Sequence, residues 1–340
     1  MLNLNSVSSI IRQSTRKPGD TWNLLCFSAH ERFEQNICGL NANFYALQGQ
    51  NVRVWNQQYS KIPDNYRFVK QRIPPNLVFD AIISHNPFVH IPLATQVARQ
   101  LHIPIINIFH TDSPNSSWNR QVFEQNRRLF DQCQHHVFIT EYNKISWGFK
   151  NEKNCTVIEH GIDSELFIPQ LNGKRENYIL TVGNDFINRD QELGYSIWGK
   201  VTEGLPTKVI GNTPGLSDPA KTQQELIGEL QRAKAYINTT LRSPFPMSLL
   251  EAFSVGLPCV TTNTNAISDF FTHGHDCLMF NPNEPEQGRK YLERLLSDDY
   301  ECKRLGENAR KTILEKFKMS TFLEKWEKLL QEVCEKPYLG

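Results

Sequence analysis

The sequence predicts an α/β protein built from two doubly wound domains, each a parallel sheet covered by helices. Short apolar runs alternate along the chain with segments of helical periodicity, which is the pattern of successive βαβ units. The chain has 340 residues, more than one hydrophobic core usually serves, and the alternation starts again after Pro169. We therefore place the domains at 1–168 and 169–340, with the last helix able to cross back to the first domain.

The N-terminal domain is expected to contain two clear helices between short strands. One helix carries Ile37, Leu40, Phe44 and Leu47 on one face and ends at Gly49. The other presents leucine and valine at helical spacing over 93–101. Apolar runs of strand length predict strands at 23–27, 52–55, 80–84, 104–109, 137–139 and 156–158.

The C-terminal domain repeats the alternation. The segment QQELIGELQRAKAYINTT (223–240) reads as a helix followed by a strand, and the residues after 280 read as helices rich in Lys and Glu. Further strands are predicted at 178–182, 207–210 and 258–262.

Composition gives no sign of a nucleic-acid or membrane protein. Lys and Arg number 37 against 36 Asp and Glu, a net charge of +1, so the chain has no overall field for anionic partners. No apolar run has the length of a membrane span, and the first residues lack a secretory signal pattern. The eight cysteines contain no CxxC pair, which favours reduced thiols and a cytoplasmic protein. The ten histidines show no HExxH spacing, so we expect no structural metal.

The loops after the strands are where ligands bind in such sheets. They read SAHERFE, HNPF, HTDSP, GNDFINRD, GNTPG and LRSPFPMS. No GxGxxG or GxxxxGK[ST] motif follows a strand, which removes support for nicotinamide-dinucleotide and P-loop chemistry. The absence of GxSxG weakens an α/β-hydrolase interpretation.

Glu251 allows two interpretations. Ser248-Leu-Leu-Glu251 fits a capping box, in which the two side chains bind each other's main-chain N–H groups. Alternatively, a carboxylate at a helix N-terminus could bind the hydroxyls of a ribose while the free N–H groups meet a diphosphate.

The roles of three further residues were also considered: Arg189, His110 and His160. Arg189 is either a solvated cation or a phosphate clamp, for which the planar guanidinium is well suited. His110 ends the strand PIINIF, so it is either an ordinary loop residue or a residue that points toward a cleft between the domains. His160, in VIEHGIDSELF, is expected to shape the turn into the linker.

Five stretches, in order along the chain, resemble the retaining glycosyltransferases of family 4, which have the GT-B fold. They read IPIINIFHTD, TVIEHGIDSELF, GNDFINRD, SLLEAFSVGLPCVTT and NAISDFFTHGHDCLMF. The resemblance implies two Rossmann-like domains facing across a cleft, with the nucleotide sugar held by the C-terminal domain and the acceptor by the N-terminal one. It implies retention of configuration and no metal cofactor, and the sequence contains no Asp-x-Asp.

The resemblance also assigns roles by position. Glu251 matches the second Glu of the family's Glu-x7-Glu motif, which binds the ribose; Arg189 matches a residue that grips the diphosphate; and His110 matches a histidine beside the transferred sugar. Further donor-site positions are Gly183, Asn184, Ser243, Met247, Ser248, Leu249 and Leu250. Candidate acceptor-side residues, together with His110, are His30, Glu31, Arg32, Asn86 and Asp112.

The chain departs from the family pattern in its first loop, which lacks paired glycines, and at two donor positions. Ser243 replaces the first motif Glu and Asn184 replaces an Arg. The expected activity is transfer of a sugar from a nucleotide donor to an acceptor hydroxyl. The alternatives are a sugar-nucleotide epimerase or hydrolase, and a non-catalytic binding protein. The sequence does not identify the sugar, the base, the acceptor (a glycan, a lipid-linked glycan, a protein or a small molecule) or the oligomeric state.

Overall fold

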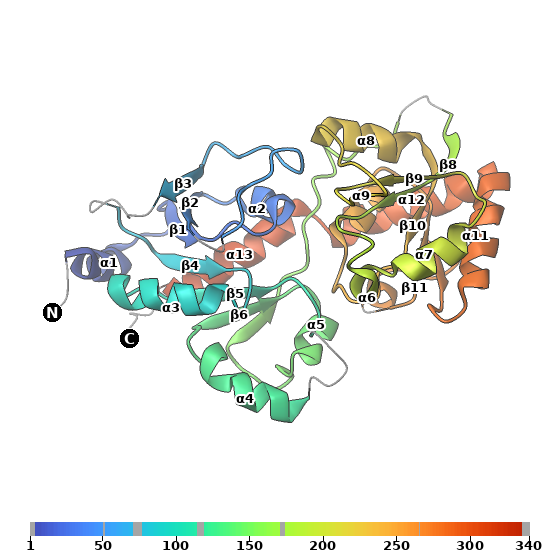
Figure 1. Ribbon diagram of the computed structural model, residues 1–340. Helices are drawn as coiled ribbons and strands as arrows, with labels where there is room; N and C mark the ends of the chain where they lie inside the picture. The colour runs from blue at the N-terminus through green and yellow to red at the C-terminus, as the bar shows by residue number, and fades with distance from the viewer. Residues whose placement is uncertain are drawn as a thin grey trace. The chain divides into compact units, whose positions relative to one another are not determined.

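The computed structural model describes residues 4–49, 52–70, 77–113, 119–170, 174–264 and 266–334. The chain forms two compact units, one from Met1–Glu159 with Ser320–Gly340 and one from His160–Met319. Each unit contains a single parallel β-sheet with helices packed on it (Figure 1). The predicted fold class is thereby confirmed for both halves of the chain.

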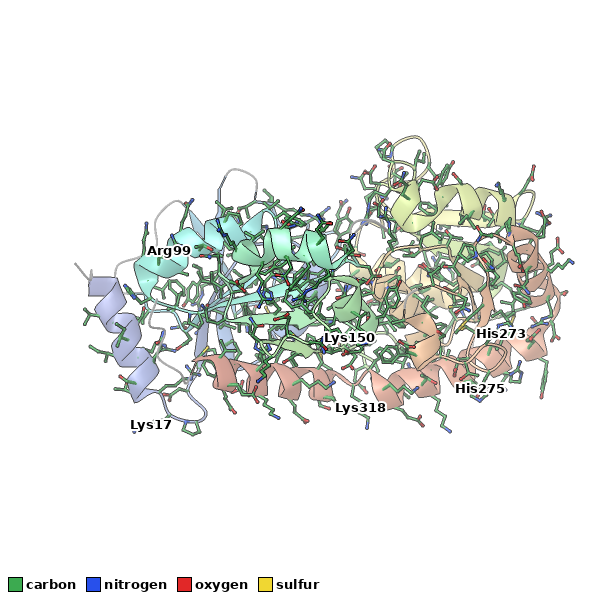
Figure 2. All side chains as sticks on the ribbon, turned by 90° about the horizontal axis from the view of Figure 1, so that it is seen from below. Lys17, Arg99, Lys150, His273, His275 and Lys318 are labelled. Carbon is green, nitrogen blue, oxygen red and sulfur yellow. The ribbon has the colours of Figure 1, made fainter. Side chains whose placement is uncertain are left out.

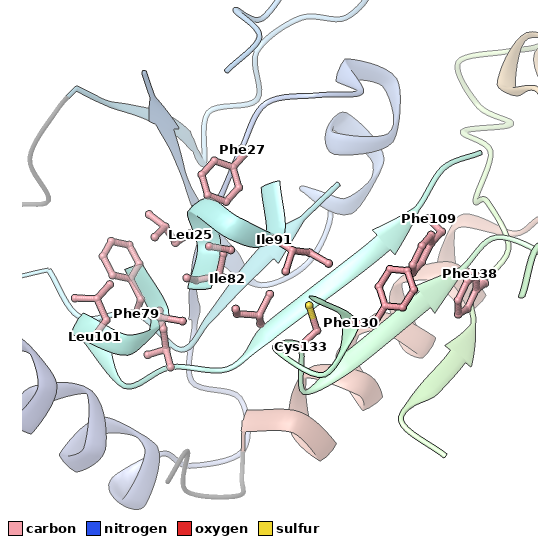
Figure 3. Packing of buried hydrophobic residues seen from close by; sticks show 14 of the residues in the cluster. Leu25, Phe27, Phe79, Ile82, Ile91, Leu101, Phe109, Phe130, Cys133 and Phe138 are labelled. Atoms are coloured by element: carbon pink, nitrogen blue, oxygen red, sulfur yellow. The ribbon is translucent and has the colours of Figure 1, made fainter. Parts of the chain in front are cut away.

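The N-terminal unit contains a seven-stranded sheet in the order β3-β2-β1-β4-β5-β6-β7. Its strands are β1 (Trp22–Cys26), β2 (Ala42–Gln48), β3 (Tyr66–Lys70), β4 (Ala81–Ser84), β5 (Ile105–Phe109), β6 (His135–Phe138) and β7 (Cys155–Val157). Its helices are α1 (Leu4–Thr15), α2 (Glu31–Ile37), α3 (His90–Leu101), α4 (Arg120–Phe130), α5 (Glu141–Ser146) and most of α13 (Met319–Cys334). Apolar side chains of β4, β5, β6 and α3 form its core (Figure 3).

The last helix belongs to the N-terminal unit, although it is the end of the chain. Phe322 and Trp326 of α13 pack edge-on against Phe33 of α2, with ring centroids 5.7 and 6.2 Å apart. The Trp22 indole N–H donates to the Glu327 carboxylate at 2.9 Å. These contacts place α13 beside the start of β1.

The prediction of a helix over 37–48 is mostly wrong, because residues 42–48 form β2. Phe44 and Tyr45 are both buried although neighbouring strand residues point to opposite faces. A strand covered on both faces has a continuous apolar run, so its periodicity does not distinguish it from a helix. The strand expected at 52–55 is also wrong, since those residues form a loop and β3 lies further on.

The C-terminal unit contains a five-stranded sheet in the order β12-β11-β10-β8-β9. Its strands are β8 (Glu176–Val182), β9 (Thr207–Ile210), β10 (Ala233–Asn238), β11 (Cys259–Thr262) and β12 (Leu278–Phe280). Its helices are α6 (Asp190–Leu193), α7 (Tyr195–Thr202), α8 (Gln223–Arg232), α9 (Met247–Ser254), α10 (Ile267–Phe270), α11 (Pro285–Ser297) and α12 (Asp299–Lys316).

The C-terminal unit begins at His160 and not after residue 168, where the sequence placed the boundary. The intervening segment is bound to this unit by main-chain and side-chain contacts. Ile162 forms a parallel bridge with Lys318, and the Phe167 carbonyl accepts from the Ser254 hydroxyl at 2.8 Å. The observed boundary differs from the predicted one because the partners of this segment lie far along the chain. A local linker pattern in the sequence cannot show such distant contacts.

Each sheet has one point where the strand order reverses. In the N-terminal unit β1 and β4 are neighbours, while β1 continues to β2 on one side and β4 continues to β5 on the other. In the C-terminal unit the corresponding pair is β8 and β10. Loops that leave such strand pairs at their carboxyl ends diverge and form the usual ligand sites of doubly wound sheets.

Candidate functional site

The loops after β8 and β9 interlock at the carboxyl end of the C-terminal sheet. The Asn184 side-chain oxygen accepts from the Asn212 N–H at 2.8 Å, and the Gly183 N–H donates to Ile210. Gly211 has a φ of +145°, and a Cβ there would lie 2.0 Å from the Gly183 carbonyl oxygen. The predicted donor positions Gly183 and Asn184 therefore lie on a loop whose course is fixed by main-chain contact.

Arg189 lies at the exposed N-terminal end of α6. Its N–H donates to the Asp185 carbonyl, and its own carbonyl accepts from Glu192 and Leu193. Asp185 has a φ of 52°, a left-handed conformation that turns the loop back toward the helix. Within the described residues no ion pair of Arg189 is present, so its guanidinium is held by no carboxylate there.

Glu251 is the fifth residue of α9 and is only 3% exposed. The capping-box interpretation is wrong: the helix begins at Met247, its N-cap is Pro246, and no side chain caps it. The Ser248 hydroxyl instead accepts from the Tyr236 hydroxyl at 3.0 Å. A carboxyl group in the second turn of a buried helix is costly to desolvate, which favours a functional role over a packing role.

The other predicted donor positions surround the start of α9. Leu249 and Leu250 are fully buried, and both of their N–H groups donate to the Pro246 carbonyl. Met247 and Ser248 are half-buried and belong to the first turn, whose N–H groups have no acceptor within a helix. Any main-chain contact with a ligand at this helix end falls to those two residues.

Ser243 lies half-buried in the loop between β10 and α9. The two residues before it anchor the loop, because the N–H groups of Leu241 and Arg242 both donate to the Glu192 carbonyl. The Arg242 guanidinium also contacts the Glu192 carboxylate at 3.2 Å. A cation therefore lies next to the position where the family pattern has its first Glu.

A network of buried hydroxyl and amide groups supports this loop and was missed in the sequence. The Thr240 hydroxyl donates to the Asn238 oxygen at 2.7 Å, and the Asn238 amide donates to the Thr261 hydroxyl at 3.0 Å. The hydroxyls of Thr262 and Thr264 both donate to the Thr240 carbonyl. The paired threonines that follow β10 and end β11 were the available signal.

In the N-terminal unit the switch point gathers histidines from three loops. The His110 ring, after β5, lies 4.1 Å from the His30 ring, after β1, measured between centroids. His110 Nε2 lies 2.9 Å from Nδ1 of His85, the residue that follows β4. His30 is exposed, His110 is half-buried and His85 is 5% exposed. The structure thus brings together two predicted residues and adds His85, which the sequence interpretation passed over in favour of Asn86.

Three predicted acceptor-side residues make local structural contacts. The buried Glu31 carboxylate accepts from the Asn56 N–H at 3.0 Å and pairs with Arg53. The half-buried Arg32 donates to the Gln35 side chain. The exposed Asn86 side chain accepts from the N–H groups of residues 88 and 89, which leads the chain into α3.

Asp112 is a buried carboxyl group two residues after His110, in the loop that follows β5. One of its oxygens accepts from the Asn143 amide at 3.0 Å, and burial raises its pKa to about 6. Within the described residues its Oδ2 atom has no hydrogen-bond partner. Asp112 is therefore poised to change its charge near neutral pH.

Glu34 is a second acidic residue of the SAHERFE loop region that the sequence interpretation passed over. Its carboxyl group is 2% exposed, accepts from the Tyr66 hydroxyl at 2.9 Å, and lies 3.7 Å from His85 Nε2. Burial is the main cause that raises its pKa to about 7, and main-chain N–H donors at Ala29 and His30 oppose the shift. A buried carboxyl group next to the histidine pair is a functional-site signature.

A cavity of about 570 Å³ lies elsewhere in the C-terminal unit, near β12. Its lining includes Asn263, Asn281, Gln287, His273 and Tyr291. The side chains of His273 and His275 lie in the segment before β12 (Figure 2). The lining contains none of the predicted site residues, so the sequence gives this cavity no role.

The described ranges contain neither a candidate metal centre nor a helix that could span a membrane. No group of three or more His, Cys, Asp or Glu side chains there could hold a metal ion. None of the helices described is both long and apolar enough to cross a membrane.

Comparison with known proteins bears on the C-terminal unit first. Residues 219–312 match the family model of glycosyl transferases group 1. This segment includes the loop before α9, Glu251 and the whole of β11.

Three curated proteins are similar over part of their length. Sulfoquinovosyl transferase SQD2 of Arabidopsis thaliana is 25% identical over 68% of this chain, and MMP alpha-(1->4)-mannosyltransferase of Mycolicibacterium hassiacum is 25% identical over 47%. Exopolysaccharide phosphotransferase SCO2592 of Streptomyces coelicolor is 31% identical over 26%. The matched regions span 52%, 44% and 9% of those proteins.

Among solved structures, Anabaena Alr3699/HepE in complex with UDP and glucose matches with a TM-score of 0.70 at 11% identity. The match covers 92% of this chain and all of that one. The chain has the GT-B fold. This likeness shows the fold, and the match to group 1 glycosyl transferases rests on residues 219–312.

The GT-B fold agrees with the placement of the candidate residues. Glu251, Arg189 and the loops around them lie at the switch point of the C-terminal sheet, and His110 lies at that of the N-terminal sheet. These are the positions where doubly wound sheets bind ligands.

Proposed function

We propose that this chain is a glycosyltransferase that moves a sugar from a nucleotide-activated donor to an acceptor hydroxyl, with retention of configuration and without a metal. The observation that carries the proposal is Glu251, a buried carboxyl group on α9 inside the segment that matches group 1 glycosyl transferases. Its place at the carboxyl end of the C-terminal sheet supports a donor-binding role.

The donor would be held by groups of complementary charge. The first-turn N–H groups of α9, at Met247 and Ser248, and the exposed Arg189 would meet the diphosphate, and Glu251 would accept hydrogen bonds from the ribose hydroxyls. As the sugar leaves, negative charge grows on the diphosphate. Preorganised donors then stabilise the transition state more than the ground state.

The N-terminal unit would supply the acceptor side. His110 is the proposed contact with the transferred sugar, and the exposed His30, whose ring is tilted against that of His110 at 4.1 Å between centroids, would face the acceptor. Glu31, Arg32 and Asn86 would act only by shaping this region, since their side chains make local contacts.

The test measures nucleotide affinity and turnover together. Because UDP binds the similar Anabaena protein, UDP and UDP-glucose are the first ligands to try, followed by GDP and ADP sugars. Glu251→Gln is expected to weaken nucleotide binding by about 1.5–3 kcal/mol, the range for hydrogen bonds to charged groups. Glu229→Gln is the matched control, a buried carboxylate of the same unit that binds Lys208 and Tyr178.

Each outcome has one meaning. Equal nucleotide affinity in wild type and folded Glu251→Gln contradicts the proposed donor site. Donor turnover that needs no acceptor would indicate an epimerase or hydrolase. Tight nucleotide binding without any turnover would indicate a non-catalytic protein, which Ser243 in place of the first motif Glu favours.

A further inference from the structure

At the N-terminal switch point three buried or half-buried side chains, those of His110, His85 and Glu34, follow one another in a line of contacts. His110 Nε2 lies 2.9 Å from His85 Nδ1, and His85 Nε2 lies 3.7 Å from Glu34 Oε1. The three residues come from different elements: the loop after β5, the loop after β4, and α2. Only His110 is more than 5% exposed.

Packing fixes the orientation of both rings. The His85 and His110 rings stack at 21°, with centroids 5.2 Å apart, and Phe33 meets the His110 ring edge-on at 4.8 Å. The main-chain N–H of His85 donates to His90 Nδ1 at 3.3 Å, which holds the loop against the start of α3. Rings held in this way cannot turn over freely, so proton placement alone decides which ring nitrogen donates.

Each ring in the line carries one proton when neutral, so the two rings must be complementary. At 2.9 Å one nitrogen of the pair His85 Nδ1 and His110 Nε2 donates and the other accepts. Which of the two nitrogens donates is set at His85 Nε2, because an ionised Glu34 attracts a proton to that atom. His85 Nδ1 then accepts, and the proton of His110 lies on Nε2.

We propose that Glu34 and His85 are positioning residues that set the tautomer of His110. With Glu34 ionised, neutral His110 carries its proton on Nε2 and its Nδ1 is a hydrogen-bond acceptor. With Glu34 neutral, His85 carries its proton on Nδ1 and His110 carries its proton on its own Nδ1, which becomes a hydrogen-bond donor. The tautomer follows from the contacts and from the charge of Glu34; that Nδ1 meets a hydroxyl of the sugar or acceptor rests on the proposed function.

The surroundings allow Glu34 to change its charge near neutral pH. Burial raises the pKa of Glu34 to about 7, with a smaller contribution from the Glu31 carboxylate, while the Tyr66 hydroxyl and two main-chain N–H groups favour ionisation. Burial also holds the pKa of His85 well below its ordinary value, and His90 and His30 act in the same direction.

Three other buried titratable groups near Glu34 stay neutral. Cys26 and Cys38 lie near Glu34, and burial raises the pKa of both thiols. Burial also raises the pKa of Tyr66 far above its ordinary value. His85 therefore remains a neutral ring with one proton to place, and Glu34 is the group that places it.

Glutamine at position 34 reproduces the neutral state in a fixed form. Its oxygen can accept from the N–H groups of Ala29 and His30, as Glu34 Oε2 does now, and its amide then faces Tyr66 and His85. At a contact distance of 3.7 Å, the positive end of an amide N–H disfavours a proton on His85 Nε2, where a carboxylate attracts one. The proton of His85 moves to Nδ1, and that of His110 moves to its own Nδ1.

The experiment reads the tautomer of His110 directly, by two-bond proton–nitrogen correlation spectra of protein labelled with ¹⁵N at histidine. Spectra of His85→Gln and His110→Gln assign the two signals. Above pH 7 we expect the Nε2–H form of His110 in wild type and the Nδ1–H form in Glu34→Gln. Glu31→Gln is the matched control, a buried carboxylate of the same helix that faces Asn56, and it should keep the wild-type form.

Wild-type protein gives a second readout that needs no variant. Its His110 tautomer should change as the pH crosses about 7, the pKa of Glu34, and should not change in Glu34→Gln. One His110 tautomer common to wild type on both sides of that pH and to folded Glu34→Gln overturns the inference.

Turnover separates this inference from the proposed function. If the chain is a transferase, Glu34→Gln should lower kcat on the order of 10²-fold with nucleotide affinity unchanged, the size of a misplaced general acid–base group. A reversed tautomer in a protein that transfers no sugar upholds the inference and rejects the function. Transfer by wild type with an unchanged tautomer does the opposite.

Discussion

Glu34 makes the free energy of unfolding fall with rising pH, and Glu34→Gln should remove that dependence. The carboxyl group is 2% exposed, and burial raises its pKa from 4.5 to about 7. The folded state therefore holds the proton more tightly than the unfolded chain does. The stabilisation is complete below pH 4.5 and is lost as the pH rises through about 7.

The magnitude follows from the difference between the two pKa values. Each pKa unit corresponds to about 1.4 kcal/mol, so ionising Glu34 in the folded protein costs about 3 kcal/mol relative to ionising it in the unfolded chain. His85 and His90 act in the opposite sense, because burial lowers their pKa values. Their stabilisation is present above pH 6.5 and lost below it, so the prediction concerns the difference between wild type and Glu34→Gln.

Urea denaturation across this pH range measures that difference. The free energy of unfolding of Glu34→Gln, relative to wild type, should rise by about 3 kcal/mol between pH 4.5 and a pH above 7. Glu31→Gln should keep most of the wild-type pH dependence, since the Glu31 carboxylate contributes less than burial to the raised pKa of Glu34. A constant difference between wild type and Glu34→Gln at every pH would mean that Glu34 has the same pKa in the folded and unfolded protein, which refutes the raised pKa.

Three further substitutions test the C-terminal unit. Gly211→Ala should lower the free energy of unfolding by more than about 2 kcal/mol because its Cβ would overlap a carbonyl at a φ of +145°, while Gly199→Ala, in a helix with open space, should not destabilise. Arg175→Lys should lower the free energy of unfolding in urea by about 2–4 kcal/mol, since one ammonium cannot reach the carbonyls that both guanidinium ends bind. As a control, Lys311→Ala removes only an exposed ion pair and should lower it by less than about 0.5 kcal/mol. Arg189→Ala should weaken binding of a nucleotide diphosphate sugar about tenfold and leave nucleoside binding unchanged by calorimetry; equal weakening of both would contradict a diphosphate contact.

Periodicity predicted most of the C-terminal unit because its strands and helices alternate with clear polar loops. It failed at β2, where a strand buried on both faces has no alternation to read. The loops that follow β8 and β10 could be located from the sequence because the strands before them were predicted; their role in donor binding stays a prediction. The threonine network beneath them was missed, because the paired threonines show that hydroxyls are present but not whether they bind one another or water.

The two acidic residues of α2 show where prediction from sequence ends. Glu31 and Glu34 are three residues apart on one short helix, and both are buried. The sequence interpretation named Glu31 among the candidate acceptor-side residues and did not name Glu34. In the folded chain Glu31 reaches Asn56 and Arg53, whereas Glu34 reaches Tyr66 and His85. These partners lie 22 to 51 residues further along the chain and belong to strands and loops whose pairing sets the distances. The chemistry of the acidic pair is therefore decided by strand order, with β3 and β4 on opposite sides of β1, and not by any property of the motif that contains it.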